Sequence, residues 1–241
     1  MDGEDPVEIF NGRKKRRVGE KEVKLTEDGG SSTTSSSELR IAIEKLYSER
    51  SSTTVILVPT SSFLSISNLL LLLLDKIGPT MAVLRSDIQT NVQRLEERYV
   101  MNPSLYSNLV EILKREREEG VAKRRNSCSR AVVWLNRSVE FGLDVMERLM
   151  KDKGLSVEEA VEEAYCSKLK PWHGWISSAA YKVALRMIPN RIELTELVMG
   201  NQRDYSMMED EIRVLGSIVQ PILDEINSQL RILKLAKLRS K

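Results

Sequence analysis

The sequence predicts an all-α fold of about eight helices. Apolar residues recur at helical spacing from about Glu38 onward, and alternation with a period of two is scarce. Glycine, proline and asparagine interrupt the pattern at intervals of helix length. Val55–Val58 is the only run that resembles a strand, and we find no internal repeat of about 20–50 residues. These observations favour one helical domain over a sheet-containing or solenoid fold.

The expected helices lie between clear interruptions. These interruptions are Gly78-Pro79, Asn102-Pro103, Gly154, Pro189-Asn190 and Gly200-Asn201. The predicted helices cover 38–50, 61–77, 82–100, 104–119, 126–152, 156–168, 172–188, 191–200 and 207–237. The leucine run Leu69–Leu74 follows polar residues and ends at Asp75, well short of the roughly 20 apolar residues that span a bilayer. We therefore predict that 61–77 is a buried core helix.

Residues 1–37 have a different composition from the rest of the chain. They contain a basic block, Arg13–Arg17, and a low-complexity stretch, Gly29–Ser37, and cannot bury enough apolar surface to fold. We expect a disordered basic, serine-rich tail over 1–37 and a folded domain over 38–241. The basic block is an inert solvated segment, a nuclear import signal or a contact for anionic membranes. The N-terminus is acidic rather than a signal peptide, so we expect a cytoplasmic protein that could enter the nucleus through residues 13–17.

Composition argues against several classes of function. The net charge of +2 and the 5% aromatic content do not favour a nucleic-acid partner. Cys128 and Cys166 are far apart in sequence and His173 is the sole histidine, so we expect no metal site and a reducing compartment. His173 has no evident nucleophile partner, and no glycine-rich phosphate loop is present. We therefore expect no catalytic residues, no cofactor and no enzymatic activity.

Helix 82–100 carries a polar stripe beside an apolar one. At about 100° per residue, Asn91, Arg94 and Arg98 fall within about 40° of Asp87, next to a stripe of leucine, isoleucine and valine. A carboxylate, an amide and a guanidinium beside apolar residues suit an amphiphile with a polar head, because the carboxylate and the amide can each bind vicinal hydroxyls. The alternative is an intrahelical Asp–Arg pair on a solvated edge.

Two other helices carry candidate ligand contacts. On 126–152, Phe141 and Val145 share a face with Trp134, whose indole could stack on a sugar ring, although plain core packing is the alternative. On 172–188, His173 heads a column of small residues, which leaves room for a ligand chain or for a neighbouring helix. That column is Ser177, Ala180 and Ala184. The opposite side carries Trp175, Lys182 and Arg186, a combination favoured at membrane interfaces.

Taken together, these segments resemble the glycolipid transfer protein (GLTP) family. "SDIQTNVQRLEERY" (86–99) resembles its D-x-x-x-N-x-x-K/R motif, "VVWLNRSVEF" (132–141) its segment with a sugar-stacking tryptophan, and "WHGWISSAAYKVALRMIP" (172–189) its H-G-W helix. "FLSISNLLLLLLDKIGPTM" (63–81) fits the helix and turn before the first motif. The motifs occur in the family's order, so the resemblance covers about residues 60–235.

The resemblance implies a two-layer all-α sandwich of about eight helices, the GLTP fold. It implies a monomeric carrier that shields the two chains of one sphingolipid, touches membranes transiently and performs no chemistry. Asp87 would bind a sugar hydroxyl and the ceramide amide N–H, Asn91 and Arg94 would bind sugar hydroxyls, and Trp134 would stack on the sugar. His173 would bind the ceramide amide oxygen. The apolar pocket would include Phe141, Val145, Tyr165, Ala180, Tyr181 and Ala184. Trp175 would dock on the membrane together with Lys182 and Arg186.

The same resemblance separates headgroup classes. The ceramide-1-phosphate branch has arginine at the position of Trp134 and again four residues on, where this chain has Ser138. We therefore expect a simple neutral sugar headgroup, such as that of glucosylceramide. A ceramide-1-phosphate carrier and a sphingolipid sensor that binds without shuttling are the alternatives. The chain departs from the family at its C-terminus, where Ile232 takes the place of a tyrosine and a basic stretch, 231–241, follows.

Overall fold

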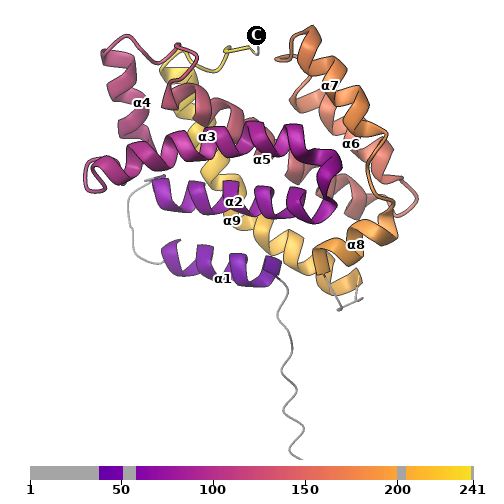
Figure 1. Ribbon diagram of the computed structural model, residues 1–241. Helices are drawn as coiled ribbons and strands as arrows, with labels where there is room; N and C mark the ends of the chain where they lie inside the picture. The colour runs from indigo at the N-terminus through magenta and orange to yellow at the C-terminus, as the bar shows by residue number, and fades with distance from the viewer. Residues whose placement is uncertain (1–37, 51–57, 200–204, 240–241) are drawn as a thin grey trace, which may run out of the picture. The chain divides into compact units, whose positions relative to one another are not determined.

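The structure, a computed structural model, describes residues 38–50, 58–199 and 205–239. These residues form nine α-helices and one 3₁₀ helix, with no strand among them (Figure 1). The helices are α1 (Glu38–Arg50), α2 (Thr60–Ile77), α3 (Ala82–Met101), α4 (Leu109–Glu118), α5 (Cys128–Lys151), α6 (Val157–Lys168), α7 (Trp175–Leu185), α8 (Arg191–Met199) and α9 (Tyr205–Ile232), with η1 (Pro79–Met81) between α2 and α3. The predicted all-α fold is confirmed. Residues 55–57 of the strand-like run lie outside the described residues, and Val58 precedes an isolated bridge between Pro59 and Asn108.

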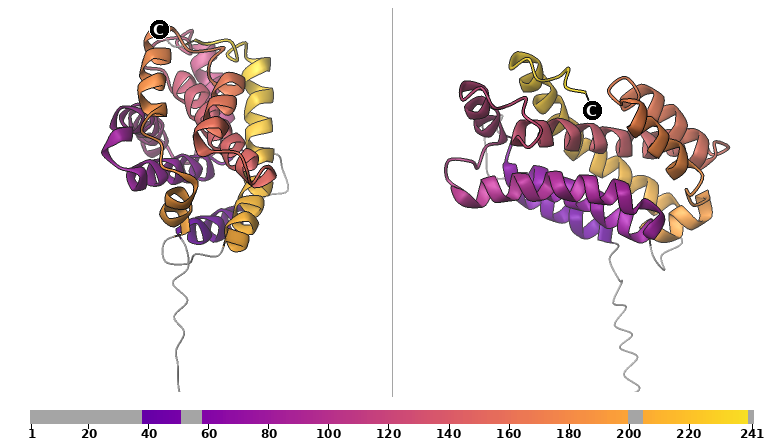
Figure 2. Two further views of the ribbon diagram at one scale, coloured as in Figure 1. Left: turned by 90° about the vertical axis from the view of Figure 1, so that its right-hand side faces the viewer. Right: turned by 45° about the horizontal axis from the view of Figure 1, so that its top comes forward.

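The helices of residues 38–239 pack in two layers. In one layer α2 packs between α1 and α3; in the other α5 packs against α6 and α9, and α5 also contacts α2 and α3. Figure 2 shows α3 and α5 running in opposite directions along neighbouring paths, with α4 at one end of the pair and α6 and α7 at the other. Helix α5 therefore contacts helices of both layers, and it also contacts α4 at one end of the pair and α6 at the other.

Helix α2 is a core helix. By length and composition alone it could cross a membrane, yet half of its residues are buried inside the protein. Phe63 is fully buried and Leu71 and Leu74 nearly so, all three in the cluster that also takes residues from α3, α4, α5 and α9. Ile66 and Leu69 enter a second cluster with α1, α6, α8 and α9. The prediction of a buried helix over 61–77 is confirmed.

The start of α5 is fixed by a buried carboxylate. Both oxygens of Glu116 accept hydrogen bonds from the backbone, one from the Cys128 N–H at 2.8 Å and the other from the Ser129 N–H at 2.7 Å. Glu116 is 3% exposed, and the Arg98 guanidinium lies 3.8 Å from one of its oxygens. Ser127 caps the helix by accepting a hydrogen bond from Arg130 N–H. These contacts tie α3 and α4 to the first turn of α5, since a carboxylate satisfies N–H groups that a helix N-terminus leaves unpaired.

Helix α9 ends five residues earlier than its apolar pattern predicts. Lys234 adopts a left-handed conformation (φ 58°), which an α-helix cannot continue through. The N–H of Leu235 donates to Leu230 O at 2.8 Å and the N–H of Lys234 donates to Arg231 O at 3.0 Å, the pair of bonds that closes a Schellman motif. This turn buries Leu235 completely, and the chain then continues in a new direction to Arg239.

Candidate functional site

The polar stripe on α3 is linked by hydrogen bonds. The Arg94 guanidinium donates to Asn91 Oδ1 at 3.1 Å, and Asn91 Nδ2 donates to the backbone carbonyl of Asp87 at 3.0 Å. Neither bond involves the Asp87 carboxyl. Arg94 is therefore hydrogen-bonded to Asn91 and not, through these bonds, to Asp87. Part of the Asp87 side chain is open to solvent, yet the surrounding protein raises the pKa of its carboxyl by desolvation. A hydroxyl that donates to this carboxyl would do so in a partly desolvated place, where hydrogen bonds are stronger.

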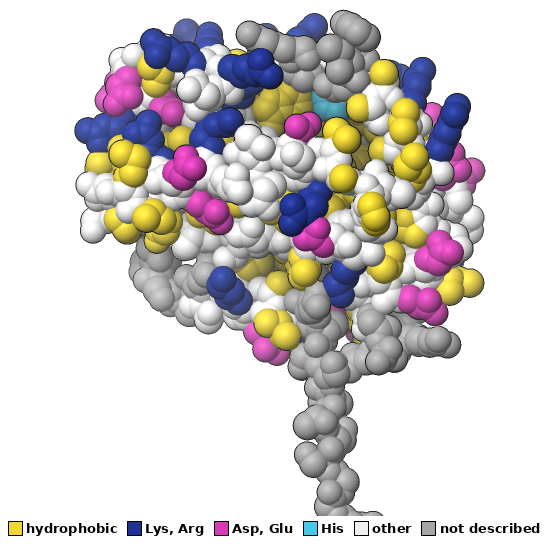
Figure 3. Space-filling view, viewed as in Figure 1, with side chains coloured by type: hydrophobic (Ala, Val, Ile, Leu, Met, Phe, Trp, Pro, Cys, Tyr) yellow, Lys and Arg dark blue, Asp and Glu magenta, His cyan; other side chains and the backbone are white. Residues whose placement is uncertain are grey.

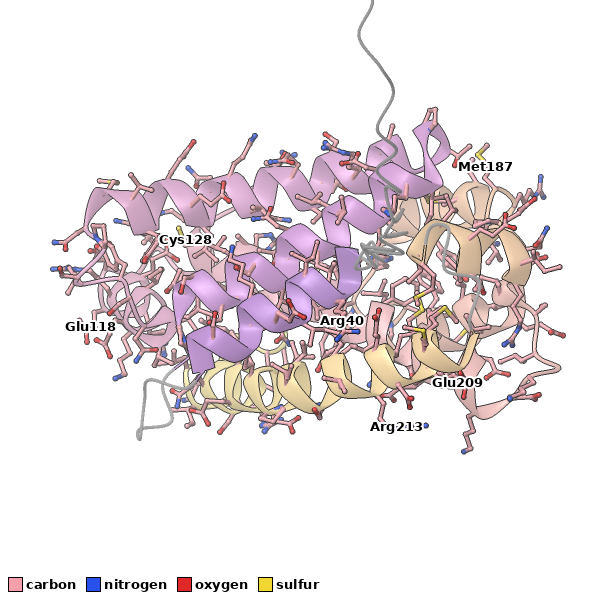
Figure 4. All side chains as sticks on the ribbon, turned by 90° about the horizontal axis from the view of Figure 1, so that it is seen from below. Arg40, Glu118, Cys128, Met187, Glu209 and Arg213 are labelled. Carbon is pink, nitrogen blue, oxygen red and sulfur yellow. The ribbon has the colours of Figure 1, made fainter. Side chains whose placement is uncertain are left out.

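The register between α3 and α5 brings Asp87 level with Trp134. Cys128 Sγ lies 3.5 Å from the carbonyl oxygen of Arg94, and Figure 4 shows Cys128 beside α3. Because the two helices are antiparallel, moving seven residues back along α3 and seven forward along α5 pairs Asp87 with Leu135, the neighbour of Trp134. Burial raises the pKa of the Cys128 thiol to about 11, so this residue is a packing contact rather than a reactive thiol.

Trp134 and His173 lie together in the structure. Their ring centroids are 5.5 Å apart with the ring planes inclined by 34°, and both side chains are partly buried. His173 Nδ1 is 3.4 Å from the Tyr165 hydroxyl, which donates to Ser178 Oγ at 3.2 Å. Burial, and then the charge of Arg137, lower the pKa of His173, so the neutral imidazole is favoured. Figure 3 shows the single histidine of the described surface flanked by apolar side chains and an acidic one.

His173 precedes α7 instead of heading it. The predicted helix over 172–188 is shortened to 175–185, because residues 169–173 form a turn in which Trp172 N–H and His173 N–H both donate to Leu169 O. The expected column of small residues therefore does not continue from the histidine. Ala180 is exposed, and Ala184 packs against the cluster that joins α2, α3, α4, α5 and α9. The side chains of Trp175 and Ser177 lie outside the described residues, while Lys182 and Arg186 are exposed.

The predicted pocket residues are divided between two environments. Val145 is buried and Phe141 partly buried in the cluster that joins α5, α6, α8 and α9. Tyr165 is buried and stacks on Tyr181, with ring centroids 3.4 Å apart. The Tyr181 hydroxyl is buried with no hydrogen-bond partner among the described residues, and burial raises its pKa. The site therefore combines a partly open polar rim, at Asp87, Trp134 and His173, with a closed apolar interior.

The described cavities lie away from this rim. One is lined by methionine, leucine and isoleucine side chains between α5, α8 and α9. These include Met146, Met150, Leu194, Met208 and Ile212. Figure 4 shows sulfur-bearing side chains gathered near Glu209, at the start of α9. The buried apolar side chains of α5 pack in the two clusters with residues of the neighbouring helices. Within the described residues no group of three histidine, cysteine or acidic side chains could hold a metal ion.

Comparison with known proteins agrees with this geometry. A family model described as glycolipid transfer protein (GLTP) matches residues 58–200, the segment that contains Asp87, Trp134 and His173. The chain belongs to the glycolipid transfer protein family. Members of this family are lipid transfer proteins rather than enzymes, and the chain is accordingly a GLTP-fold lipid transfer protein.

Relatives and solved structures support the same membership. Glycolipid transfer protein 3 of Arabidopsis thaliana is 43% identical over 91% of this chain and 94% of its own length, and glycolipid transfer protein 2 is 45% identical over 76% and 82%. The structure showing how FAPP2 selects simple glycosphingolipids with the GLTP fold matches with a TM-score of 0.69, 23% identity, and 76% and 90% coverage. A complex of an Arabidopsis ACD11 variant with ceramide-1-phosphate matches with a TM-score of 0.70, 18% identity, and 83% and 98% coverage. At these identities the two structures establish the fold.

Sequence reasoning missed a part of the GLTP-like site that the structure contains. Arg137 is 6% exposed, and its guanidinium lies 4.9 Å from the centroid of Trp134 and 4.1 Å from that of Trp172. The contact between Arg137 and Trp134 could have been predicted from the sequence, because the two residues are three positions apart on one helix. Nothing in the sequence indicated the second, because Trp172 comes from a turn 35 residues away.

Proposed function

We propose that this lipid transfer protein carries a glycosphingolipid with a simple neutral sugar headgroup, such as glucosylceramide, between membranes. The observation that carries the proposal is the partly open Trp134 indole beside His173. The antiparallel register of α3 and α5 indicates that Asp87 lies at the same level. A flat indole offers its face to a sugar ring, and the carboxyl of Asp87 and the amide of Asn91 offer hydrogen-bond acceptors to its hydroxyls. Two Arabidopsis relatives that are more than 40% identical to this chain over the aligned residues are named glycolipid transfer proteins, which also supports a sugar headgroup.

The apolar interior would shelter the lipid chains. Each CH₂ moved from a membrane to water costs about 0.8 kcal/mol, so two long chains cost on the order of 20 kcal/mol. A carrier must offset most of this with apolar contacts, such as those available around Phe141 and Val145. Selectivity then comes from the polar rim, where each buried polar group left unpaired by a wrong headgroup costs about 1–3 kcal/mol.

A phosphate headgroup is the second candidate, because proteins complexed with ceramide-1-phosphate share the fold and Arg137 places a cation next to Trp134. Two of the Arg137 nitrogens, however, already donate to the carbonyls of Ala236 and Leu238 at 2.7 Å. Ser138 adds no second cation on the following turn. The neutral sugar is therefore favoured, since a phosphate needs free charged donors.

Transfer between vesicles tests the proposal. We expect the wild type to move fluorescent glucosylceramide, but not ceramide-1-phosphate, between phosphatidylcholine vesicles. Asp87→Val should abolish this transfer and Trp134→Ala should reduce it about tenfold, since each removes a headgroup contact worth about 1–3 kcal/mol. Gln93→Val, on the far side of α3, is the matched control and should transfer normally.

Normal glucosylceramide transfer by a folded Asp87→Val variant would contradict the headgroup assignment. Tight binding without transfer by the wild type would indicate a sensor.

A further inference from the structure

Arg137 joins three segments that are far apart in sequence. Its guanidinium lies between the rings of Trp134, on the same helix, and Trp172, on the turn that carries His173. Two of its nitrogens donate hydrogen bonds of 2.7 Å to the carbonyl oxygens of Ala236 and Leu238, in the segment after α9. With 6% of its surface exposed, Arg137 is a buried cation whose two hydrogen bonds go to neutral acceptors.

The C-terminal segment is firmly held where Arg137 meets it. The turn at Lys234 redirects the chain, and the side chain of Leu235 is buried in the cluster that contains Val132, Val133 and Leu135 of α5. Two further arginines bind the same segment: Arg117 Nε donates to Leu233 O at 3.0 Å, and Arg130 donates to Arg239 O. Residues 233–239 thus form a structured strap across α5, held at four of their backbone carbonyls.

Stacking on a guanidinium constrains the orientation of an indole. A planar cation sandwiched between two aromatic rings is attracted to both of their faces, and its hydrogen bonds fix the plane of the guanidinium itself. Burial lowers the pKa of Arg137 to about 10, which leaves it charged at neutral pH. The strap therefore fixes Arg137, and Arg137 in turn restrains Trp134 and the turn with Trp172 and His173.

We propose that Arg137 is a positioning residue for headgroup recognition, bracing Trp134 and the Trp172–His173 turn against the C-terminal strap. This proposal rests on the proposed function, because it takes the Trp134 ring as the surface on which the sugar stacks. The brace holds the ring at the angle that a sugar needs before any lipid arrives. Preorganisation of this kind raises affinity for the headgroup without contributing to the binding of the chains.

The affinity ratio between two lipids tests the brace. The dissociation constants of fluorescent glucosylceramide and of the matching ceramide, which lacks the sugar, are measured for full-length variants. We expect Arg137→Leu to lower the preference for glucosylceramide about tenfold while ceramide binding stays unchanged. Arg137→Lys keeps the charge but not the flat stacking surface, so its preference should fall to an intermediate value. Trp172→Leu, which leaves the hydrogen bonds of Arg137 in place, should lower the preference in the same direction.

Arg130→Gln is the matched control: it removes the strap contact at Arg239 and a neighbouring positive charge, but it leaves the two hydrogen bonds and the two ring contacts of Arg137 in place. It should keep the wild-type preference. An unchanged ratio in a folded Arg137→Leu variant, or an equal loss of both lipids in Arg137→Leu and Arg137→Lys, would overturn the brace.

Fluorescence without lipid separates this proposal from the proposed function. With phenylalanine at positions 172 and 175, Trp134 is the only remaining tryptophan. Arg137→Leu in this background should shift its emission to the red as the ring is released to solvent, whereas Arg130→Gln should not. Equal binding of both lipids by the wild type would contradict the proposed function. The emission shift would still show whether Arg137 restrains the Trp134 ring. If Arg137→Leu causes no shift, the proposed role of Arg137 is wrong.

Discussion

At the residue scale, the charge of His173 is set by its neighbours. The imidazole is partly buried, contacts the Tyr165 hydroxyl at 3.4 Å, and lies near the Arg137 guanidinium on α5. Burial removes water that would stabilise an imidazolium, and the guanidinium repels it, so the pKa of His173 falls below its ordinary value. Because the Tyr165 hydroxyl donates to Ser178 Oγ, a neutral imidazole donates from Nδ1 to Tyr165 and keeps Nε2 as an acceptor. To donate from Nε2 to a lipid amide oxygen, the ring would need the Tyr165 hydroxyl to turn its proton toward Nδ1.

The stability of the protein should therefore depend on pH through His173. Below the ordinary histidine pKa of about 6.5 the unfolded chain takes up a proton that the folded site resists, so stability is lost as pH falls from about 6.5 toward the lowered folded pKa. The loss is at most about 1.4 kcal/mol per pH unit. Urea unfolding at several pH values should show this slope in the wild type and its absence in His173→Gln. Asp87, whose pKa is raised, acts at lower pH and with the opposite sign. Equal slopes in the two proteins would refute the environment described for His173.

Single residues also show how far sequence could predict the site. Asp87, Trp134 and His173 were identifiable because each occurs in a short motif whose order matches one family. Arg137 was not, since its burial depends on a turn at Trp172 and on carbonyls at positions 236 and 238, which only the folded chain brings to α5. Backbone acceptors carry no residue identity, so no sequence pattern could reveal them.

At the element scale, α5 acts as a support held at both ends. Glu116 fixes its first turn, and at the other end Arg191 donates to the carbonyls of Leu149, Asp152 and Leu155 at 2.6–2.8 Å. Trp134 lies between these two anchors, less than two turns after Cys128. The position of the indole relative to α3 is therefore set by hydrogen bonds at the two ends of α5, and those made by Glu116 are buried.

Loss of the Glu116 carboxylate should destabilise the protein strongly. Glu116→Ala leaves two buried N–H groups unpaired and the Arg98 charge without its partner, so we expect a loss of about 3 kcal/mol. Glu116→Gln keeps one acceptor oxygen and should lose less. Glu119→Gln, three residues on with an exposed side chain, is the control and should resemble the wild type. Urea unfolding measures all three, and a small loss in Glu116→Ala would show that α5 does not depend on this cap.

Element boundaries were predictable where the chain itself carries the signal. The interruptions Gly78-Pro79 and Pro189-Asn190 gave the end of α2 and the start of α8 correctly. Helix α4 starts at Leu109 and not at 104, because Asn108 caps it by accepting from the Val110 N–H at 3.1 Å. Helix α9 ends at Ile232 because Lys234, a residue with no evident turn propensity, takes a positive φ to bury Leu235. Such endings are decided by tertiary burial and cannot be read from local composition.

At the scale of the whole molecule, two apolar clusters share α2, α5 and α9. One cluster joins them to α3 and α4 beneath the polar rim, and the other joins them to α1, α6 and α8. Phe141 and Val145 belong to the second cluster, whereas Trp134 is next to Val133 and Leu135 of the first. A lipid bound by its head at the rim would therefore extend along α5 from one cluster toward the other. Methionines at that far end, such as Met146 and Met208, can repack around a chain because their side chains are flexible.

Residues 1–37 have a composition that cannot bury enough apolar surface to fold, whereas Ile43 and Leu46 of α1 are buried in the second cluster. We therefore predict that a chain starting at Glu38 keeps the wild-type melting temperature and transfers glucosylceramide between phosphatidylcholine vesicles at the wild-type rate. A full-length variant with glutamine at each of positions 13–17 serves as the control that separates charge from length.

If the basic block contacts membranes, the transfer rate of both variants should fall only when the vesicles contain anionic lipid, since that attraction is electrostatic. If it is an import signal, both should instead lose nuclear accumulation in cells while transfer is unchanged. A lowered melting temperature in the shortened chain alone would mean that residues 1–37 contribute to the fold, contrary to the predicted division at residue 38.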